Sequence, residues 1–538
     1  MSIRDASAAC VFGRPRRPNP PPDRRIAVLK LQGWRALGAG LIAGALAALA
    51  MPPLFWLPLA VVGFVLLVWL WADAPTARIA ALRAWFWGIG HFTVGSYWMV
   101  EAFFVPPADF ALLGPPAVLG LAMVLGAFPA AAAWTTRILV QRWPHLGGHY
   151  RRLILLAVAW TVTEWLRGHI FTGFPWNPLA HVWAFATPLL QGASLVGVYG
   201  LGTLTFMILA SPAAGWRASL ASLAVVGLAG VAGQQAMESS APATAGPVVR
   251  IVQPNVPQAE KWQPDSRARE LQKLIDLSRR DGFERVTAVI WPETAIPFIV
   301  QPGSLGLPML ATAAPPGGYL LAGAARSGPD VKEGVWNSLL AIDSAGAVVA
   351  TYDKVHLVPF GEYIPFHKEW PPLGGLIGRG SFERGESFTT LTVPGLPGFS
   401  PLICYEALFP GEVTGPGARP AWLLNITNDA WFGVSSGPYQ HLVSARLRSI
   451  EEGLPTIRAA NTGVSAVIDA YGRILASLEM EHEGVIDHVL PQPRTETPYA
   501  RWHDWTLLML LTILVSCVFL VGQERKTSVR NLTANSKS

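Results

Sequence analysis

The 538-residue sequence contains little charge and few cysteines. Charged residues make up 14% of the chain, against about 25% in a typical soluble domain, and hydrophobic residues make up 51%. High hydrophobicity with so little charge excludes an intrinsically disordered chain. Three cysteines are too few for a disulfide-built scaffold. The shortage of charge instead indicates segments that lie in a membrane.

The sequence also lacks two common kinds of binding pattern. It has no glycine-rich phosphate-binding loop and no internal repeat. His356, His367 and His441 lie in unrelated contexts, so nothing has the spacing of metal ligands. We therefore expect no metal and no cofactor.

Long apolar runs are what the sequence has in abundance. A membrane-spanning helix needs about 20 apolar residues, and no run of that length lies between residues 245 and 500. We expect eight spans, at residues 36–51, 54–71, 84–105, 111–135, 153–171, 189–211, 218–236 and 505–522.

These runs divide the chain into five predicted parts. They are an Arg- and Pro-rich segment (1–35), a seven-helix transmembrane domain (36–240), a water-exposed domain (245–495), a closing helix (505–522) and a tail (523–538). The first part has no short apolar segment with a cleavage site, so we do not expect a signal peptide.

The distribution of Lys and Arg predicts one topology, because cationic loops stay in the cytoplasm. Residues 1–35 hold eight Lys or Arg, and the tail and every second loop hold more. The intervening loops at 52–53, 106–110 and 172–188 hold none. Both termini are therefore expected in the cytoplasm, with the water-exposed domain outside.

The predicted outer domain has the opposite charge balance from the whole chain. The net charge of the chain is +6, whereas residues 236–501 carry 21 Lys or Arg and 27 Asp or Glu. A mildly acidic domain is a poor binder of polyanions. We therefore expect no nucleic acid partner.

Glu164 and Arg167 form a charged pair in the fifth predicted span. Ionisable groups within a membrane are costly and often functional. Two oppositely charged residues three positions apart on a helix also neutralise each other's charge. Mutual neutralisation near the outer interface is the favoured interpretation, and a functional role is the alternative.

The outer domain alternates apolar strands with helices, which is typical of layered α/β folds. Strands are expected at 248–252, 286–290, 319–322, 338–342, 348–352, 388–393, 401–404, 422–427, 456–460, 465–469 and 484–489, and helices at 267–280 and 438–452.

Cys404 is the sole thiol of the predicted outer domain. A single buried cysteine is usually an inert core residue. Cys404, however, follows an apolar strand, and Glu293 and Lys354 also follow strand candidates. A carboxylate can take the thiol proton, the thiolate can attack a carbonyl, and an ammonium can stabilise the resulting oxyanion. The three residues together meet the requirements of acyl transfer.

The motifs around these residues resemble a known superfamily. Glu293 lies in WPE, Lys354 in DKVHLVPFGEYIP and Cys404 in ICYE. Together they resemble the Glu-Lys-Cys triad of the nitrilase, or carbon–nitrogen hydrolase, superfamily. That resemblance implies an α/β domain with an α-β-β-α sandwich fold.

The eight expected spans narrow the resemblance to the apolipoprotein N-acyltransferase family of the bacterial inner membrane. TGFPW at 172–176, the pattern from Gln253 to Trp262 and NDAWFG at 428–433 also fit that family. The resemblance covers residues 35–522, and the Arg- and Pro-rich start has no counterpart. It implies a polytopic α-helical membrane protein whose nitrilase-like domain is extracytoplasmic, in the periplasm.

The resemblance also implies site roles. Glu293 is expected to be the general base and acid, Lys354 the oxyanion stabiliser and Cys404 the nucleophile. Glu362 and Glu406 are expected to orient Lys354 and the nucleophile. The expected substrate-pocket or support positions are Trp262, Asn337, Tyr405 and Trp431; for Trp431 a purely structural role is the alternative.

The implied reaction is the final step of lipoprotein maturation, a ping-pong exchange with two lipid partners. Cys404 is expected to take an acyl chain from a phospholipid such as phosphatidylethanolamine. The thioester would then acylate the amine of the diacylglyceryl-cysteine of an apolipoprotein. The apolar stretch 365–382 is expected to be either a lipid-touching arm or an ordinary surface loop.

Two other functions compete with this one. A membrane-tethered amidase or nitrilase would use the same triad with water as the acceptor. A non-enzymatic transporter or scaffold would make the Glu, Lys and Cys coincidence accidental. Eight spans exceed what a tether needs, which favours a lipid substrate.

Overall fold

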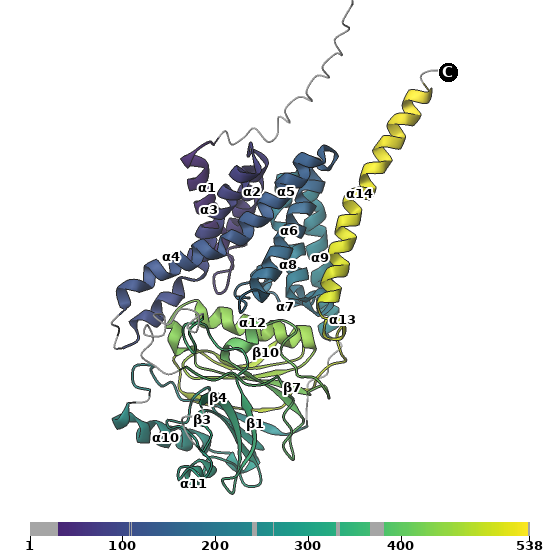
Figure 1. Cartoon of the computed structure of the whole chain (residues 1–538). Helices are drawn as coiled ribbons and strands as arrows, with labels where there is room; N and C mark the ends of the chain where they lie inside the picture. Colours follow the sequence, from purple (N-terminus) through teal and green to yellow (C-terminus); the bar gives the residue numbers. More distant parts are fainter. Residues whose placement is uncertain are drawn as a thin grey trace, which may run out of the picture.

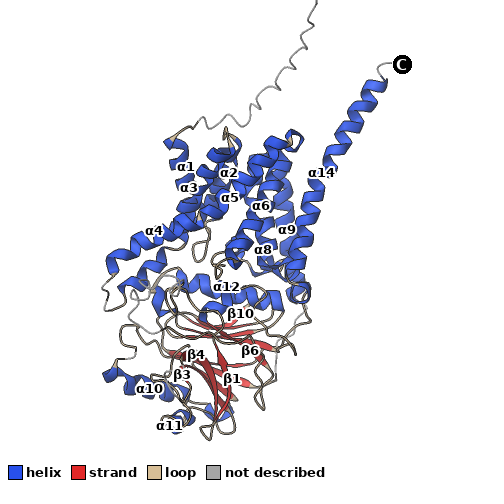
Figure 2. Cartoon of the chain, in the orientation of Figure 1, coloured by secondary structure: helices blue, strands red, loops and turns tan. Residues whose placement is uncertain are grey.

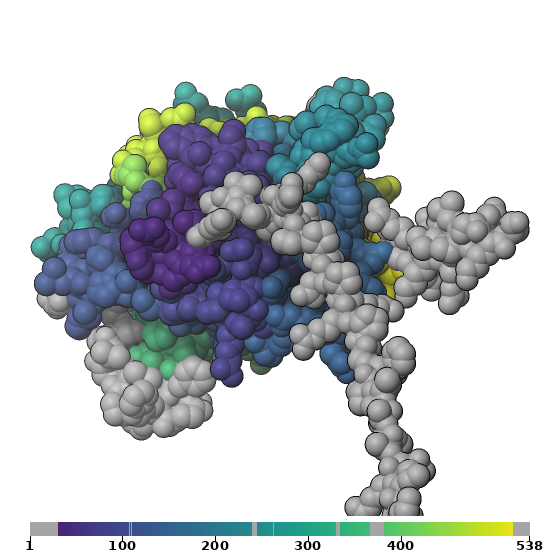
Figure 3. Space-filling model, turned by 90° about the horizontal axis from the view of Figure 1, so that it is seen from above, coloured from purple at the N-terminus to yellow at the C-terminus, as the bar shows by residue number. Residues whose placement is uncertain are grey.

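The computed structural model describes residues 31–106, 108, 110–238, 245–261, 263–329, 334–365 and 381–535, with side chains as far as residue 519. A helical half lies on one side of the molecule and a β-sandwich on the other (Figure 1). Seen from the helical side, residues of the N-terminal half cover most of the face (Figure 3).

The helical half is built from apolar helices joined by short turns and 3₁₀ segments. Its α-helices are α1 (Trp34–Ala48), α2 (Leu57–Ala72), α3 (Ala77–Gly95), α4 (Gly114–Leu125), α5 (Ala127–Arg142), α6 (His149–His169), α7 (Thr187–Leu190), α8 (Ala193–Ala210), α9 (Trp216–Glu238) and α14 (Asp504–Asn535). Its 3₁₀ helices are η1 (Tyr97–Phe104), η2 (Ala111–Leu113), η3 (Pro144–Leu146), η4 (Leu179–Trp183) and η5 (Ser211–Ala214).

Three of the described helical segments are long and apolar enough to cross a membrane: Ala111–Arg142, Ala193–Ala214 and Trp216–Glu238. Three shorter apolar helices accompany them, at Trp34–Ala48, Leu57–Ala72 and Asp504–Phe519. This composition is that of a membrane protein. Eight crossings are more than these segments alone establish.

The third predicted span differs from the helix that forms there. We expected 84–105, whereas α3 occupies Ala77–Gly95 and continues as η1. Thr76 starts the helix early because its hydroxyl accepts a hydrogen bond from the Ile79 amide at 3.3 Å. Arg83 is tolerated inside because its guanidinium donates to the Leu70 carbonyl at 2.7 Å.

The sandwich consists of two mixed sheets. The first has the order β11-β1-β2-β3-β4-β5 and the second β10-β9-β8-β7-β6. In the first sheet β1, β2 and β3 are parallel neighbours, and in the second β6, β7 and β8 are. The strands are β1 (Val248–Gln253), β2 (Ala288–Ile290), β3 (Tyr319–Ser327), β4 (Val335–Asp343), β5 (Val348–Asp353), β6 (Phe399–Ile403), β7 (Trp422–Thr427), β8 (Thr456–Ala460), β9 (Ser465–Ile468), β10 (Ile474–Leu478) and β11 (Gly484–Val489).

Helices cover the outer faces of both sheets, which completes an α-β-β-α arrangement (Figure 2). A buried apolar cluster between the sheets joins residues such as Ile251 and Leu424. Helices α10 (Pro264–Ser278) and α11 (Leu307–Ala311) pack on the first sheet, and α12 (Gly437–Glu452) on the second. The remaining short helices are η6 (Phe283–Arg285), η9 (Cys404–Leu408), η10 (Asp429–Phe432) and α13 (Pro498–Trp502).

Among the described residues, one predicted strand is wrong and one strand was missed. Residues 388–393 form no strand; Leu391 makes an isolated bridge to Phe399. Pro394 follows at once, and proline cannot donate to a ladder. The missed strand is β10, an edge strand that is largely exposed and therefore has no continuous apolar pattern.

Helix α12 is the layer shared by the two halves. Val443, Leu447 and Ile450 on this helix belong to the same apolar cluster as the core of the helical half. Leu442 and Ala445 belong to the cluster on the second sheet. Figure 1 shows α12 at the boundary between the bundle and the sheets. The sandwich is thus packed against the bundle through this helix.

The Gln440 amide ties three connections of the helical half to α12. Its Oε1 accepts from the indole nitrogens of Trp98 at 3.0 Å and Trp176 at 2.7 Å. Its Nε2 donates to the Pro52 carbonyl at 3.3 Å. Segments far apart in the sequence therefore meet at one side chain.

Candidate active site

The predicted triad lies at the ends of three strands. Glu293 follows β2, Lys354 follows β5 and Cys404 follows β6. Functional groups gather at the carboxyl ends of parallel strands in α/β folds, and two of these residues obey that rule. The structure brings all three together: Lys354 Nζ lies 3.3 Å from Glu293 Oε1, and both charges act on the Cys404 thiol.

The segment carrying Glu293 lies directly against β3. A Cβ added at Gly323 would approach the Pro292 carbonyl oxygen at 2.5 Å and the Glu293 Cα at 2.6 Å. Only glycine allows this close approach. The Ile296 amide then donates to the Gly323 carbonyl at 3.2 Å, which holds the segment in place.

The Glu293 carboxylate has a partner on each oxygen. Oε1 accepts from Asn337 Nδ2 at 2.7 Å and from Lys354, and Oε2 accepts from the Asn428 amide at 2.9 Å. Burial alone would raise the pKa of Glu293, but the Lys354 ammonium and these donors hold it below the ordinary value. The group is therefore ionised at neutral pH and ready to accept a proton.

Lys354 is buried between two carboxylates. Its Nζ lies 2.9 Å from Glu362 Oε1 as well as 3.3 Å from Glu293. Burial acts to lower the pKa of Lys354, but Glu362 and Glu293 outweigh it and raise the pKa above the ordinary value. The side chain is a permanent cation beside the thiol, as an oxyanion stabiliser must be.

Cys404 begins η9 in a strained backbone conformation. Its φ is 52°, in the left-handed region that non-glycine residues rarely occupy. Burial, followed by Glu293, raises the pKa of the thiol. The thiol is therefore protonated at neutral pH. A nucleophile of this kind needs the carboxylate to take its proton during the attack.

Glu362 and Glu406 occupy different places around the triad. Glu362 contacts Lys354 directly, and its other oxygen accepts from the Val358 amide at 2.8 Å. The hydrogen bonds of Glu406 go mainly to backbone amides beside the triad. Glu406 accepts from the amides of Val355 at 2.6 Å and Ile403 at 2.7 Å, which belong to the segments carrying Lys354 and Cys404. Both placements fit the expected orienting roles.

The expected substrate-pocket or support residues are distributed as follows. Asn337 bridges Glu293 and Glu362, to whose Oε1 it donates at 2.8 Å. Tyr405 donates its hydroxyl to the Gly173 carbonyl at 2.9 Å, in a loop of the helical half. Trp431 is half-buried on η10. Trp262 lies outside the described residues, as does nearly all of the predicted 365–382 arm.

Further buried polar residues of the site were given no role from the sequence. Lys261 donates to the Glu293 carbonyl oxygen at 3.1 Å, and burial lowers its pKa to about 8. Asp429, His441 and Arg458 form a cluster behind Cys404. Lys261 and Asp429 lie in motifs quoted above, and those motifs could have indicated a role for them. For Arg458 the sequence signal is a cation within an apolar strand.

The Glu164–Arg167 pair lies close to the site without joining it. Arg167 Nη2 is 3.5 Å from Glu164 Oε1. Arg167 Nη1 also donates to the carbonyls of Phe174 at 2.7 Å and Trp176 at 2.8 Å. The pair therefore holds the loop that receives the Tyr405 hydroxyl.

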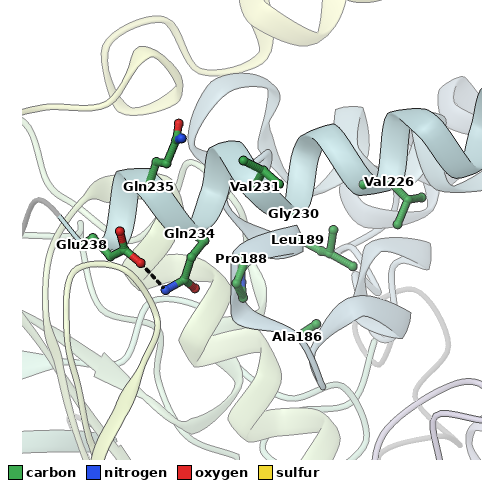
Figure 4. Close-up of a pocket in the computed structure, with 10 residues that line it drawn as sticks. Ala186, Pro188, Leu189, Val226, Gly230, Val231, Gln234, Gln235 and Glu238 are labelled. Atoms are coloured by element: carbon green, nitrogen blue, oxygen red, sulfur yellow. Dashed lines mark hydrogen bonds between the residues drawn. The ribbon is translucent and has the colours of Figure 1, made fainter.

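A groove among the described residues lies apart from the triad, and no metal-ligand cluster is found among them. No group of three or more His, Cys, Asp or Glu is placed to hold a metal ion within the part of the chain that the structure describes. A mainly apolar groove is lined by residues of α7 and α9, among them Leu189, Val226 and Gln234 (Figure 4). Its lining includes none of Glu293, Lys354 and Cys404.

Comparison with known proteins agrees with both halves. The family model described as "Apolipoprotein N-acyltransferase N-terminal domain" matches residues 43–211, and the one described as "Carbon-nitrogen hydrolase" matches residues 248–498. Among solved structures, the chain is similar to Saccharomyces cerevisiae Nit3, a member of branch 10 of the nitrilase superfamily. The identity is 20% and the TM-score 0.35, over 46% of this chain and 90% of that chain.

Relatives match nearly the whole chain. The apolipoprotein N-acyltransferase of Rhodopseudomonas palustris is 39% identical over 518 residues, covering 91% of this chain and 95% of the relative. That of Bradyrhizobium diazoefficiens is 40% identical over 537 residues, covering 94% and 98%. The resemblance seen at the motifs is thereby confirmed. The chain is a membrane-bound acyltransferase with a nitrilase-like domain, and it belongs to the apolipoprotein N-acyltransferase family.

Proposed function

We propose that the chain N-acylates the diacylglyceryl-cysteine at the N-terminus of lipoproteins, with a phospholipid such as phosphatidylethanolamine as the acyl donor. The observation that carries this proposal is the buried cluster of Glu293, Lys354 and Cys404, packed against a bundle of apolar helices. Both substrates have acyl chains in the bilayer and head groups in water, which suits such an arrangement.

The first half-reaction forms a thioester on Cys404. Glu293 takes the thiol proton as Sγ attacks the ester carbonyl of the phospholipid, and Lys354 stabilises the oxyanion. Collapse of the tetrahedral intermediate breaks the ester C–O bond. Glu293 returns the proton to the departing alkoxide, which leaves as a lysophospholipid.

The second half-reaction transfers the acyl group to nitrogen. The α-amine of the lipoprotein cysteine attacks the thioester carbonyl, and Glu293 removes the proton that the new amide nitrogen releases. The C–S bond breaks, and the departing thiolate takes the proton from Glu293, which regenerates the Cys404 thiol and the Glu293 carboxylate. No cofactor enters either step, since the thioester conserves the energy of the ester bond.

The topology belongs to the same proposal. We infer eight spans that place the 245–495 domain in the periplasm and both termini in the cytoplasm, in the bacterial inner membrane. Figure 1 supports this arrangement, because α1 begins and α14 ends on the side of the bundle away from the sandwich. Helix α9 is mostly exposed, as expected of a surface that faces lipid.

One experiment separates transfer from hydrolysis. The purified protein is incubated with phosphatidylethanolamine vesicles, and the mass of Cys404 peptides is measured before and after addition of a diacylated lipopeptide. An acyl mass on Cys404 that moves to the lipopeptide amine is the expected result. Release as free fatty acid instead would identify a hydrolase.

Two variants complete the test. Cys404→Ala should abolish the adduct, whereas Cys517→Ala, which removes an exposed cysteine of α14, should leave it unchanged. An adduct that survives Cys404→Ala would overturn the thioester mechanism.

A further inference from the structure

His441 on α12 contacts the backbone of the nucleophile. Its Nε2 lies 3.0 Å from the Cys404 carbonyl oxygen, and its Nδ1 lies 2.9 Å from Asp429 Oδ1. A carbonyl oxygen and an ionised carboxylate can both only accept, so His441 donates to the Cys404 carbonyl through Nε2 and to Asp429 through Nδ1. The imidazole therefore joins a buried carboxylate to the peptide that follows the catalytic cysteine.

Asp429 fixes the imidazole from behind. Arg458 Nη2 donates to Asp429 Oδ2 at 2.7 Å, and Thr427 Oγ1 donates to Asp429 Oδ1 at 3.0 Å. Burial would raise the pKa of Asp429, but Arg458 and His441 lower it to about 2. The backbone at Gly463 passes so close that an added Cβ would lie 2.3 Å from Asp429 Oδ2. The cluster is therefore closely packed around an ionised acceptor.

The bond to the Cys404 carbonyl fixes a strained residue of the site. Cys404 has a φ of 52°, and a strained conformation persists only where its surroundings determine it. Glu406 holds the preceding amide, of Ile403, and His441 holds the following carbonyl. The Cys404–Tyr405 peptide is trans, so its N–H points opposite to the carbonyl that His441 holds.

We propose that His441, oriented by Asp429, is a positioning residue for acyl transfer. It holds the Cys404–Tyr405 peptide so that the thiol and the Tyr405 N–H keep a fixed geometry as the thioester forms. This inference rests on the proposed thioester chemistry.

Attachment of α12 to the sheet does not require this polar group. Leu442 and Ala445 already pack α12 against Leu402 and Leu423 of the second sheet. A fully buried imidazole loses hydration that an apolar side chain never had, and it is tolerated when its partners fix a needed geometry.

Two substitutions separate positioning from simple support. His441→Gln retains an Nε2 donor within reach of the Cys404 carbonyl, whereas His441→Asn is too short and retains a donor near Asp429 alone. Ser449→Ala is the matched control, because Ser449 is buried on the same helix and bonds Thr456 at 2.6 Å, away from the nucleophile.

The main readout is the single-turnover rate of thioester formation, with the KM for phospholipid and the melting temperature measured alongside. His441→Asn should lose about 100-fold in rate, as misplacement by about 1 Å does, with KM unchanged. His441→Gln should recover at least a tenth of the wild-type rate, and Ser449→Ala should stay close to wild type. Equal rates for the Gln and Asn variants would overturn the proposal.

A second readout is independent of the acyl donor. Alkylation of Cys404 by iodoacetamide should slow in the order wild type, Gln, Asn. A wild-type protein that forms no thioester would refute the proposed function. The order of the alkylation rates would still test the positioning role of His441 in that case. If both histidine variants unfold, Asp429→Asn, which keeps the shape of the acceptor, should show a smaller fall in both rates; no fall would overturn the proposal.

Discussion

A buried carboxylate–cation pair of the sandwich and one of the bundle lie near the active site, and these two pairs are built differently. In the sandwich, Glu293 and Lys354 are 3.3 Å apart, and both Glu293 oxygens accept hydrogen bonds. In the bundle, Glu164 and Arg167 are 3.5 Å apart, and Glu164 Oε2 has no hydrogen-bond partner among the described residues. One carboxylate is fully satisfied and the other is not.

The cations differ in the same way. Lys354 directs its charge to two carboxylates and the thiol, where charge would develop in the proposed reaction. Arg167 directs its donors to the backbone carbonyls of Phe174 and Trp176. The comparison teaches that the first pair has the arrangement that the proposed chemistry needs, whereas the second holds a loop against the site.

The largest expected effect is that of Lys354→Met. The change removes the cation that Glu293 and Glu362 both contact, and with it the charge that we propose stabilises the oxyanion. Thioester formation should fall by at least about 10³-fold, and the free energy of unfolding by about 3–5 kcal/mol. Intact-mass kinetics and thermal unfolding in detergent measure the two effects.

The matched control for this change is Lys273→Met. Lys273 also pairs with a carboxylate, Glu483 at 2.8 Å, but on the surface. Its removal should change stability by less than about 1 kcal/mol and leave the rate alone. Comparable losses in the two variants would contradict a special role for the Lys354 ammonium.

The next effect concerns pH. Asn337→Ala removes the amide that donates to Glu293 Oε1 and helps to keep its pKa low. The pKa of Glu293 should therefore rise, and the carboxylate should protonate at a higher pH as acid is added. The acidic limb of the rate profile for thioester formation should move to higher pH, with a lower rate on the plateau.

Ser338→Ala is the control for the Asn337 change. Ser338 is the next residue of β4 and is equally buried, but it donates to Asp353 Oδ1 at 2.6 Å. The acidic limb of the rate profile of Ser338→Ala should coincide with that of wild type. An Asn337→Ala limb that does not move would show that Glu293 is not the group whose ionisation controls the rate.

The sequence was sufficient to predict those site residues that follow a strand and lie in a distinctive motif. Glu293, Lys354 and Cys404 were expected together, and the structure places them together. The contacts of His441 and Gln440 were not predictable, because both residues lie within a helix and their partners are set by tertiary packing. A buried polar residue on a helix carries no local pattern that identifies its partner.

Strand boundaries show the same division. The central strands β7 and β8 were predicted to the residue, because burial on both faces gives apolar runs. The central strands β3 (Tyr319–Ser327) and β4 (Val335–Asp343) are longer than the predicted 319–322 and 338–342. The exposed edge strand β10 has no such run and was missed. The predicted 84–105 span missed the start of α3, because Arg83 is satisfied by a carbonyl that only the fold supplies.

The pair in the bundle gives the third prediction. Arg167→Met leaves Glu164 without a cation and two carbonyls without a donor, so stability should fall by about 3 kcal/mol. The rate of acyl transfer should fall far less than in Lys354→Met, because Arg167 acts through the 172–176 loop and Tyr405. Thermal unfolding and thioester kinetics are measured together.

Double variants sharpen the contrast between the pairs. Adding Glu164→Gln to Arg167→Met should recover part of the lost stability and part of the rate. Adding Glu293→Gln to Lys354→Met should recover stability with no recovery of rate. Recovery of the rate in the second double variant would mean that the two pairs do not differ in kind.

The smallest effect is expected from Gln440→Leu, which breaks the junction between the halves and leaves both pairs intact. The change leaves the buried indole N–H groups of Trp98 and Trp176 without an acceptor, at a cost of about 2 kcal/mol. Gln440→Glu keeps an acceptor and is the matched control. The chemistry lies within the sandwich, so turnover of a short soluble ester should be unchanged in both variants. In the proposed reaction the bundle presents the phospholipid, so turnover of phospholipid should fall a few-fold in Gln440→Leu alone. An equal fall on both substrates would show that Gln440 supports the site and not the docking of the two halves.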